Sequence, residues 1–413
     1  MDDNGGTVTE NNPVAEACDR LLTDAAQTGA TTVHLEPLED LAQVRHRVDG
    51  LLREYGKISH RALSALTDHL KELARLTPDE RQRPQEGSFR FEVDGHTFNI
   101  SIATMPVAYG EKTVLQLHDL STSIVGFEAL GLWGTTKKEL DRLVSVHDGL
   151  LVVTGPHQAG TTTTLRNIGA ILAHPTTHVT SIESQPIAPI KGVSQFIAKP
   201  IQGLRLVDGI KAATNGDAHV LLVSELSTIP SMEASLEAVL KGRLVVSSMH
   251  QTGLPSALKH LRTLSDETHL LAHTLRGVVS QRLARRLCDS CKQTVHPDRE
   301  TLKALTNAAR VTLATLQHFL EETKTESRMG LYEASEHGCS ECHYTGYKGR
   351  IGLFEVLPMT ERLQGQLMAG TTERLMVEQA VRDGVIPLKV DGLIKALCGL
   401  TSIEEVVRVT GGS

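Results

Sequence analysis

Four short runs of consecutive apolar residues constrain the fold more than any other feature of the chain. Each run is continuous rather than alternating, which is typical of a strand buried on both faces of a parallel sheet. Segments with helical spacing, such as "PSMEASLEAVLKG", separate the runs. Because strand alternates with helix, the pattern predicts a doubly wound parallel sheet with helices on both faces. The runs are "LLVVTG", "HVTSI", "HVLLVSEL" and "GRLVVSSMH".

A glycine-rich loop follows the first of these runs, in the stretch "GPHQAGTTTT". Gly155 and Gly160 have the spacing of the phosphate-loop pattern G-x-x-x-x-G-K-[ST], and Thr162 supplies its hydroxyl. Thr161 stands where the pattern has its lysine. A glycine loop between a strand and a helix lets backbone amides converge on phosphate oxygens. The candidate nucleotide-binding residues are therefore Gly155, Pro156, Gly160, Thr161, Thr162 and Thr163.

Four of the six cysteines form two Cys-x-x-Cys pairs, Cys288 with Cys291 and Cys339 with Cys342. In a reducing compartment such pairs indicate metal binding rather than disulfides. Four sulfur ligands suit tetrahedral Zn²⁺ in a closed, structural site. Two alternatives stay open, namely four reduced cysteines without a metal and an iron–sulfur cluster.

The composition argues against nucleic-acid binding and against a membrane span. The net charge is −7 and aromatic residues make up 3% of the 413 residues. We therefore expect neither a basic surface nor a base-stacking surface. The sequence has no apolar stretch of roughly 18 residues and no signal-peptide pattern, so we expect a cytoplasmic chain without direct membrane insertion. The length predicts two or three domains.

Taken in order, the motifs resemble those of the ATPase family that drives type II secretion and type IV pilus assembly. The resemblance covers residues 28–411, and its most specific part is the two cysteine blocks with the continuation "TGYKGR". The similar stretches include "HLEPLEDLAQVRHRVDGLL", "GEKTVLQLHD", "GLLVVTGPHQAGTTTTL", "VSQRLARRLCDSCK", "CSECHYTGYKGRIGLFEVL" and "DGLIKALCGLTSIEEVVRVT".

The resemblance implies an α/β fold with a RecA-like P-loop NTPase core, a small N-terminal α/β domain and a C-terminal zinc-binding helical module. Within the N-terminal domain, the residues themselves predict hairpin turns at Asp49–Gly50 and Asp94–Gly95. A further N-terminal docking domain, present in many family members, is expected to be missing. The expected divisions are a disordered tail (1–12), a PAS-like N-terminal α/β domain (13–120), a linker (121–135), the NTPase core (136–286), the tetracysteine module (287–360) and a helical region (361–413).

The resemblance also implies partners and cofactors. Family members are hexameric ATP hydrolases that press on a platform protein of the inner membrane. For this chain we therefore expect a homo- or hetero-hexamer that includes active family ATPases, and a peripheral position at the inner membrane through such partners. Zinc in the cysteine site is the expected cofactor, and ATP with Mg²⁺ is a further candidate.

The nucleotide motifs depart from the family pattern, and each departure removes a residue that the family uses at the phosphates. Besides the threonine at the lysine position, Gln158 occupies the place of a further loop glycine. Because glutamine disfavours positive φ, we expect it to keep the loop from curling closely around phosphates. The family segment Ile-Glu-Asp-Pro-x-Glu reads "IESQPI" here. Glu183 is retained, whereas Ser184 and Ile187 replace the other two acids.

The Walker B segment and the arginine positions depart as well. The family's Gly-Glu-Ile-Arg-Asp reads "SELST", which retains Glu225 and has Ser227 and Thr228 in place of the arginine and aspartate. Two family arginines that reach the phosphates from the preceding domain match Ser101 and Gln116. Arginines of this kind are worth roughly 10³- to 10⁵-fold in turnover, so we expect useful hydrolysis to be lost.

Three functions are consistent with these residues. The leading hypothesis is a non-hydrolysing scaffold or regulatory subunit of a type II secretion or type IV pilus motor. One alternative is a divergent active ATPase, with Glu225 and His250, which matches a family histidine, as candidate catalytic residues. In that case Lys112 or Arg166 would replace the missing lysine, although we expect Arg166 to point away from the phosphates. The other alternative is a nucleotide sensor without turnover. Both candidate catalytic residues are also compatible with structural, hydrogen-bonded roles.

Overall fold

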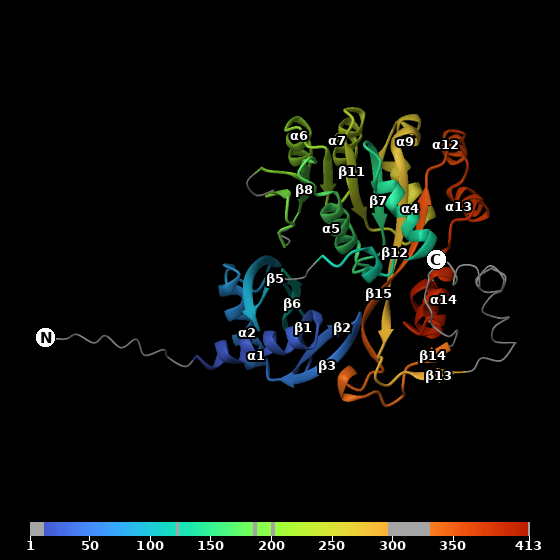
Figure 1. Ribbon diagram of the computed structural model, residues 1–413. Coiled ribbons are helices and arrows are strands. Elements are labelled where there is room, and N and C mark those ends of the chain that lie inside the picture. Colours follow the sequence, from blue (N-terminus) through green and yellow to red (C-terminus); the bar gives the residue numbers. More distant parts are fainter. Residues whose placement is uncertain (1–11, 121–123, 185–187, 200–202, 296–330, 412–413) are drawn as a thin grey trace. The chain divides into compact units, whose positions relative to one another are not determined.

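The chain divides into two compact units, residues 1–122 and 123–413. The computed structural model describes residues 12–120, 124–184, 188–199, 203–295 and 331–411 (Figure 1). Several features expected from the sequence lie outside the described residues, namely the tail at 1–11, the start of the linker at 121–123, Ile187 and the segment 296–330 between the cysteine pairs.

The first unit is a six-stranded antiparallel sheet with two helices on one face. Its strand order is β3-β2-β1-β6-β5-β4. Val33 and Leu35 of β1 point to the same side and share a core with Leu22 of α1 and Leu70 of α2. The elements are α1 (Pro13–Gln27), β1 (Ala30–Pro37), β2 (Ala42–Val48), β3 (Leu51–Ile58), α2 (His60–Leu73), β4 (Gln85–Val93), β5 (His96–Val107) and β6 (Gly110–Asp119).

Both predicted hairpin turns are confirmed. Asp49 and Gly50 join β2 to β3, and Asp94 and Gly95 join β4 to β5. All four residues have positive φ. Two consecutive residues of positive φ match the right-handed twist of the flanking strands, which is why Asp-Gly marks such turns in a sequence.

The second unit is built on a seven-stranded sheet of order β15-β12-β7-β11-β10-β8-β9. Every neighbouring pair is parallel except β12 with β15. The four apolar runs are β7, β8, β10 and β11, so the predicted parallel sheet is confirmed. The strands are β7 (Gly149–Thr154), β8 (Val179–Glu183), β9 (Val193–Ile197), β10 (Val220–Val223), β11 (Leu244–Met249), β12 (Leu275–Leu287) and β15 (Tyr347–Pro358).

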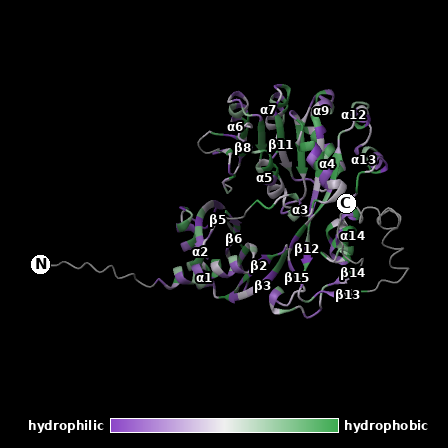
Figure 2. Cartoon of the chain, viewed as in Figure 1, coloured by the Kyte–Doolittle hydropathy of each residue, from purple (hydrophilic) through white to green (hydrophobic). Residues whose placement is uncertain are grey.

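Helices cover both faces of this sheet, and each face has its own core. Along β7, Leu150 and Val152 belong to one core, whereas Leu151 and Val153 belong to the other. This division explains why the run is apolar at every position, and Figure 2 shows hydrophobic colouring along the central strands. The helices up to β12 are α3 (Phe127–Leu130), α4 (Gly134–Val144), α5 (Thr161–Leu172), α6 (Leu206–Asn215), α7 (Ile229–Leu240), α8 (Leu254–Leu264) and α9 (Thr268–Thr274).

Two expectations about the start of this unit are corrected. The apolar spacing in "KKELDRLVSVHDG" predicts a helix that ends on its glycine, but α4 ends at Val144 and Gly149 begins β7. The described part of the expected linker, 124–135, contains Phe127 and Leu132, which are 2% and 0% exposed. Because these side chains join the core beneath α4, this stretch is packed structure of the second unit rather than a connector.

The C-terminal part of the chain adds strands and helices to the same unit. β15 lies within the segment expected to form the tetracysteine module, yet it is the edge strand of the central sheet. Among the described residues, no helix is both long and apolar enough to cross a bilayer. The remaining elements of the described residues are β13 (Gln293–Val295), β14 (Leu331–Glu333), a 3₁₀ turn (Ser340–Cys342), α12 (Glu361–Met368), α13 (Glu373–Arg382), α14 (Leu388–Leu397) and α15 (Ile403–Thr410).

Candidate functional site

The glycine-rich loop joins a buried strand to a helix, which is the context that the phosphate-loop pattern requires. It leaves β7 at Gly155 and enters α5 after Gly160, whose φ is 84°. Gln158 also adopts positive φ, at 66°. The expectation that Gln158 prevents the loop from curling is therefore wrong. The loop keeps its curled path with a non-glycine residue in the left-handed region, at a cost of roughly 1–3 kcal/mol.

The two glycines are required because Gln281 of β12 lies against the loop. A Cβ added to Gly155 would lie 2.6 Å from the Gln281 carbonyl oxygen, and one added to Gly160 would lie 2.9 Å from the Gln281 Nε2. The Gln281 side chain is buried, and its Oε1 accepts a hydrogen bond of 2.7 Å from the Thr164 hydroxyl. Sequence reasoning missed Gln281, because a polar residue in a strand carries no motif signal.

The start of α5 offers amides but no cation. The first amides of a helix have no intrahelical partners, so they are available to an anion at this end. Thr162 and Thr163 are exposed, whereas Thr161 is 4% exposed and its methyl group faces Gly155. A threonine side chain is neutral and short. The loop therefore offers backbone amides but not the ammonium group of the phosphate-loop pattern.

Three residues that the sequence singled out lie at the carboxyl edge of the sheet. Glu183 ends β8, Glu225 follows β10, and His250 follows β11, so these residues share the edge with the phosphate loop. The ring of His157, within the loop, stacks on His250 with centroids 4.1 Å apart. Glu225 is partly exposed and makes no hydrogen bond or ion pair with the described residues.

Several positions at which this chain departs from the family motifs form hydrogen bonds or strand pairs within the fold. The Ser184 amide donates to the Ser224 hydroxyl at 3.2 Å. Thr228 caps α7 by accepting from the Ser231 amide. In the first unit, Ser101 and Gln116 lie opposite each other on β5 and β6. The two positions expected to carry arginines are therefore neighbours, and neither carries a charge.

The two cations considered as replacements for the lysine have other partners. In the first unit, Lys112 forms an ion pair with Glu36 at 2.6 Å. In the second unit, the Arg166 Nη2 donates to the Ala188 carbonyl oxygen at 3.2 Å. Neither contact involves a loop residue.

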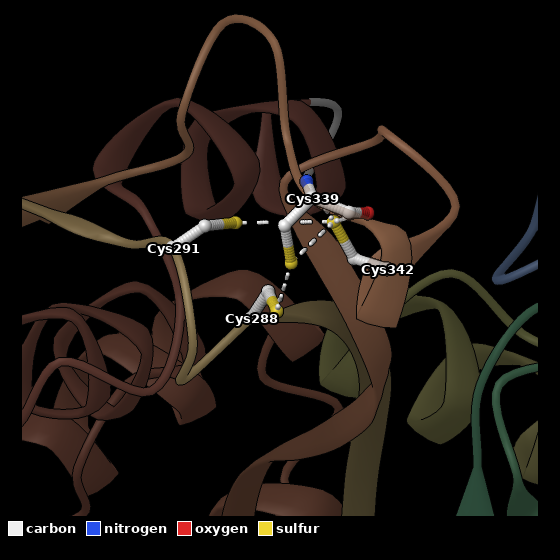
Figure 3. Close-up of side chains that lie close together, drawn as sticks. All are labelled: Cys288, Cys291, Cys339 and Cys342. Carbon is white, nitrogen blue, oxygen red and sulfur yellow. Dashed lines mark hydrogen bonds between the residues drawn. The ribbon is translucent and has the colours of Figure 1, made fainter.

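The four cysteines of the two pairs form one cluster (Figure 3). Their sulfur atoms all lie within 4.8 Å of one another and could hold a metal ion. Cys288 and Cys339 have sulfurs 3.7 Å apart, and the sulfurs of Cys291 and Cys342 are 3.8 Å apart. The sequence therefore identified the members of the cluster correctly, although they come from segments separated by more than one element.

Backbone amides polarise one sulfur of this cluster. Burial alone would raise the pKa of the Cys342 thiol, but N–H groups of Cys339 and Gly346 donate to its sulfur and lower the pKa overall. The nearby arginines contact other groups. Arg285 forms an ion pair with Glu405 and lies over the Tyr347 ring. Its charge is therefore compensated by Glu405 rather than by the cysteine sulfurs.

Known proteins resemble this chain over almost its whole length. The family model described as "Type II/IV secretion system protein" matches residues 7–408. The type II secretion system ATPase E of Vibrio cholerae is 30% identical over 398 residues, which is 96% of this chain and 75% of that protein. The type IV pilus assembly ATPase PilB of Pseudomonas aeruginosa is 31% identical over 400 residues, covering 96% of this chain and 68% of that protein.

Solved structures resemble the chain in fold. The ATPase DotB of Legionella pneumophila superposes with a TM-score of 0.68 at 15% identity, over 96% of both chains. The pilus retraction motor PilT with bound ADP has a TM-score of 0.58 at 16% identity, over 95% of this chain and 96% of that one. The predicted fold, α/β with a P-loop NTPase core, is confirmed by this likeness.

Proposed function

Because this chain belongs to the type II/IV secretion system protein family, we propose that it is a non-hydrolysing member that acts as a scaffold or regulatory subunit of a secretion or pilus motor. The observation that carries the proposal is a phosphate loop of correct path whose lysine position holds the buried, neutral Thr161. Its partners would be active ATPases of the family in a shared hexamer and a platform protein of the inner membrane, at which the chain would be peripheral.

The missing charges account for the proposed loss of turnover. Losing one charge-assisted contact to a phosphate costs roughly 1.5–3 kcal/mol. The positions of the two phosphate-contacting arginines hold Ser101 and Gln116, and such arginines are worth roughly 10³- to 10⁵-fold in rate. These losses need not multiply, but together they should remove most of the turnover.

Part of the nucleotide-binding site would still be present. Bound ATP with Mg²⁺ would supply the phosphoryl group and its metal, and the amides at the start of α5 would hold the phosphate oxygens. The exposed hydroxyl of Thr162 stands at the position that normally meets the metal. A sensor that binds nucleotide without turnover therefore remains the second candidate, favoured by the curled loop path at Gln158.

The cysteine cluster supports zinc as the metal. Four sulfurs at Zn–S distances of about 2.3 Å would lie about 3.8 Å apart at the corners of a regular tetrahedron. Three of the six sulfur–sulfur separations, at 3.7 Å, 3.8 Å and 3.8 Å, match this edge, and all four sulfurs lie within 4.8 Å of one another. With four protein ligands no coordination position is open, so zinc here would be structural.

Phosphate release tests the proposed lack of hydrolysis. The purified, zinc-replete chain and its Glu225→Gln variant are incubated with Mg-ATP beside an active family member. We expect both to release phosphate at the same background rate. Release by the unmodified chain that disappears in Glu225→Gln would overturn the proposal in favour of an active ATPase.

A mixing experiment tests the scaffold role. The chain is combined with a family member that has an intact phosphate-loop lysine, and the species are resolved by native mass spectrometry. Mixed hexamers support the proposal. Complete separation into unmixed species at micromolar concentrations argues against a shared ring.

A further inference from the structure

His157 brings a titratable ring into the phosphate loop. It lies in a tight turn that the Ala159 amide closes by donating to the Pro156 carbonyl oxygen at 3.0 Å. The side chain is exposed and makes no hydrogen bond or ion pair with the described residues. His157 is three residues from Gly160, and an extended chain spans at most about 3.6 Å per residue. The ring is therefore attached within about 11 Å of the start of α5, where the helix amides are available to an anion.

A stacking contact with His250 holds this ring at the edge of the sheet. The two ring centroids are 4.1 Å apart and the planes are inclined by 29°. The beginning of the loop is attached to the same segment, because the Gly155 amide donates to the Met249 carbonyl oxygen at 3.3 Å. The Nδ1 atom of His250 is buried and has no hydrogen-bond partner within the described chain. The two rings therefore form a pair that joins the phosphate loop to the end of β11.

The stacked pair is suited to hold one positive charge. A cation over the face of an aromatic ring is stabilised, so an imidazolium ring can stack on a neutral imidazole. Two imidazolium rings at this separation would repel each other, because like charges at short distance disfavour the charged form. Histidine is the side chain that ordinarily changes its charge between roughly pH 5 and pH 8. We therefore expect the pair to take up a single proton as the pH falls through this range.

The charged groups on the described elements around the pair are two carboxylates and two guanidinium groups. Glu183 ends β8 and Glu225 follows β10 at the same edge of the sheet, and negative charge there favours protonation of the pair. Arg166 on α5 and Arg282 on β12 oppose it, although both donate to backbone carbonyl oxygens. The loop and the first turn of α5, residues 155–164, contain no titratable side chain other than His157.

We propose that the His157–His250 pair supplies, by taking up a proton, the positive charge that Thr161 does not provide, and that the loop therefore binds phosphate-like oxyanions more tightly as the pH falls. The ligand class is a tetrahedral oxyanion, either free or as the phosphate group of a nucleotide. A charge on His157 acts on such a ligand because the two lie within about one Debye length at 0.1 M salt. His157 is a binding residue here, not a catalytic one. The inference deepens the proposed function, since it concerns the loop in which a nucleotide would bind.

A sulfate titration at two pH values tests the proposal. Sulfate keeps its charge of −2 between pH 6 and pH 8, so a change in affinity between these values comes from the protein. With the full, zinc-replete chain at constant ionic strength, calorimetry should show binding roughly 5- to 10-fold tighter at pH 6, because one charge-assisted contact is gained. Equal affinities at the two pH values would overturn the proposal, and so would an absence of binding at both.

Two histidine variants locate the effect. His157→Phe keeps an aromatic ring for the stack but cannot take up a proton, so its affinity for sulfate should be weak at both pH values. His147→Phe is the matched control, because His147 is exposed and precedes β7 at the opposite edge of the sheet. It should keep the full pH dependence. Since His157 is exposed, both variants should fold with the Tm of the unmodified chain. A pH dependence that survives in His157→Phe would refute the assignment.

A fluorescent ATP analogue distinguishes the two sources of the oxyanion. Protonation of its terminal phosphate weakens binding at low pH, so tighter binding at pH 6 would have to come from the protein. Tightening with both ligands assigns the site to nucleotide phosphates, and tightening with sulfate alone assigns it to a free oxyanion. Thr161→Lys supplies a permanent charge and should bind tightly at both pH values. None of these measurements uses hydrolysis. Phosphate release that depends on Glu225 would therefore refute the proposed function alone, whereas pH-independent binding without hydrolysis would refute this inference alone.

Discussion

The chemistry of the phosphate loop depends on the side chain at position 161. The loop itself has the required shape, because Gly160 and Gln158 both adopt positive φ and Gln281 supports the loop from β12. What the loop lacks is a permanent positive charge. Thr161 packs its methyl group towards Gly155. In the proposed nucleotide site, the helix amides would therefore be the principal anion-binding groups.

Replacing Thr161 with lysine should restore anion affinity. Because one charge-assisted contact is worth roughly 1.5–3 kcal/mol, Thr161→Lys should tighten nucleotide binding by roughly 10- to 100-fold. A titration with a fluorescent ATP analogue measures the change. Thr176→Lys, at an exposed position beyond the end of α5, is the control for a general gain of charge and should change affinity much less. Equal gains from both variants would contradict a specific role for position 161.

At the scale of elements, α15 is attached to β12 by one buried carboxylate. Glu405 is fully buried and accepts from the Arg285 amide at 2.9 Å, from the Arg285 Nη2 at 2.9 Å and from the Arg408 Nε at 2.7 Å. Burial alone would raise the pKa of the Glu405 carboxyl, but these hydrogen bonds outweigh burial and lower the pKa to about 2.

This lowered pKa predicts a loss of stability in acid. The folded-state pKa lies below the unfolded value of about 4.3, so the contribution is complete above that value and disappears as the pH falls towards 2. The full contribution is about 3 kcal/mol. Urea unfolding monitored between pH 6 and pH 3 should show a steeper decline for the unmodified chain than for Glu405→Gln. Parallel declines would contradict the role of this carboxylate.

The cysteine cluster is a second connection between separate elements. A metal bound to the four sulfurs should stabilise the folded chain. We expect about one zinc per chain by elemental analysis, and Cys291→Ser should lose the metal and lower Tm. Cys398→Ser, outside the cluster, is the matched control and should keep its zinc. Equal zinc content in both variants would contradict a four-cysteine site.

The elements that were predicted correctly are those whose own residues carry the pattern, such as a continuous apolar run or an Asp-Gly pair. The runs of β7, β8, β10 and β11 are apolar at nearly every position because both of their faces are buried, and the two Asp-Gly turns need positive φ. The end of α4 was misplaced because Gly149 starts a strand instead of capping the helix. Gln281 was missed, and β15 was assigned to a separate module, because both depend on contacts between segments distant in sequence.

The sequence predicts which residues belong to the candidate site, but not their backbone conformation or their contacts with one another. The loop glycines and the four cysteines follow from spacing alone, since spacing reflects the geometry of phosphate and metal binding. The positive φ of Gln158 could not be predicted, because the surrounding contacts override the local preference of glutamine.

At the scale of the whole molecule, the two units have separate hydrophobic cores. Within the described residues, the core that contains Val33, Leu35 and Leu70 draws every member from the first unit, and the larger cores draw theirs from the second. A unit with its own closed core can fold alone when its size exceeds roughly 60 residues. The sheet of the first unit has six strands and is covered by two helices on one face, which exceeds the minimum needed for independent stability.

We therefore expect a fragment of residues 12–120 to unfold cooperatively by itself. Two probes of a thermal melt, far-UV and near-UV circular dichroism, should give coincident transitions, because small domains unfold in one step. Leu35→Asp in the same fragment is the control, since a charge at this fully buried position should abolish the transition. Should the fragment lack a cooperative transition while the full chain is folded, the first unit would depend on the second for its stability.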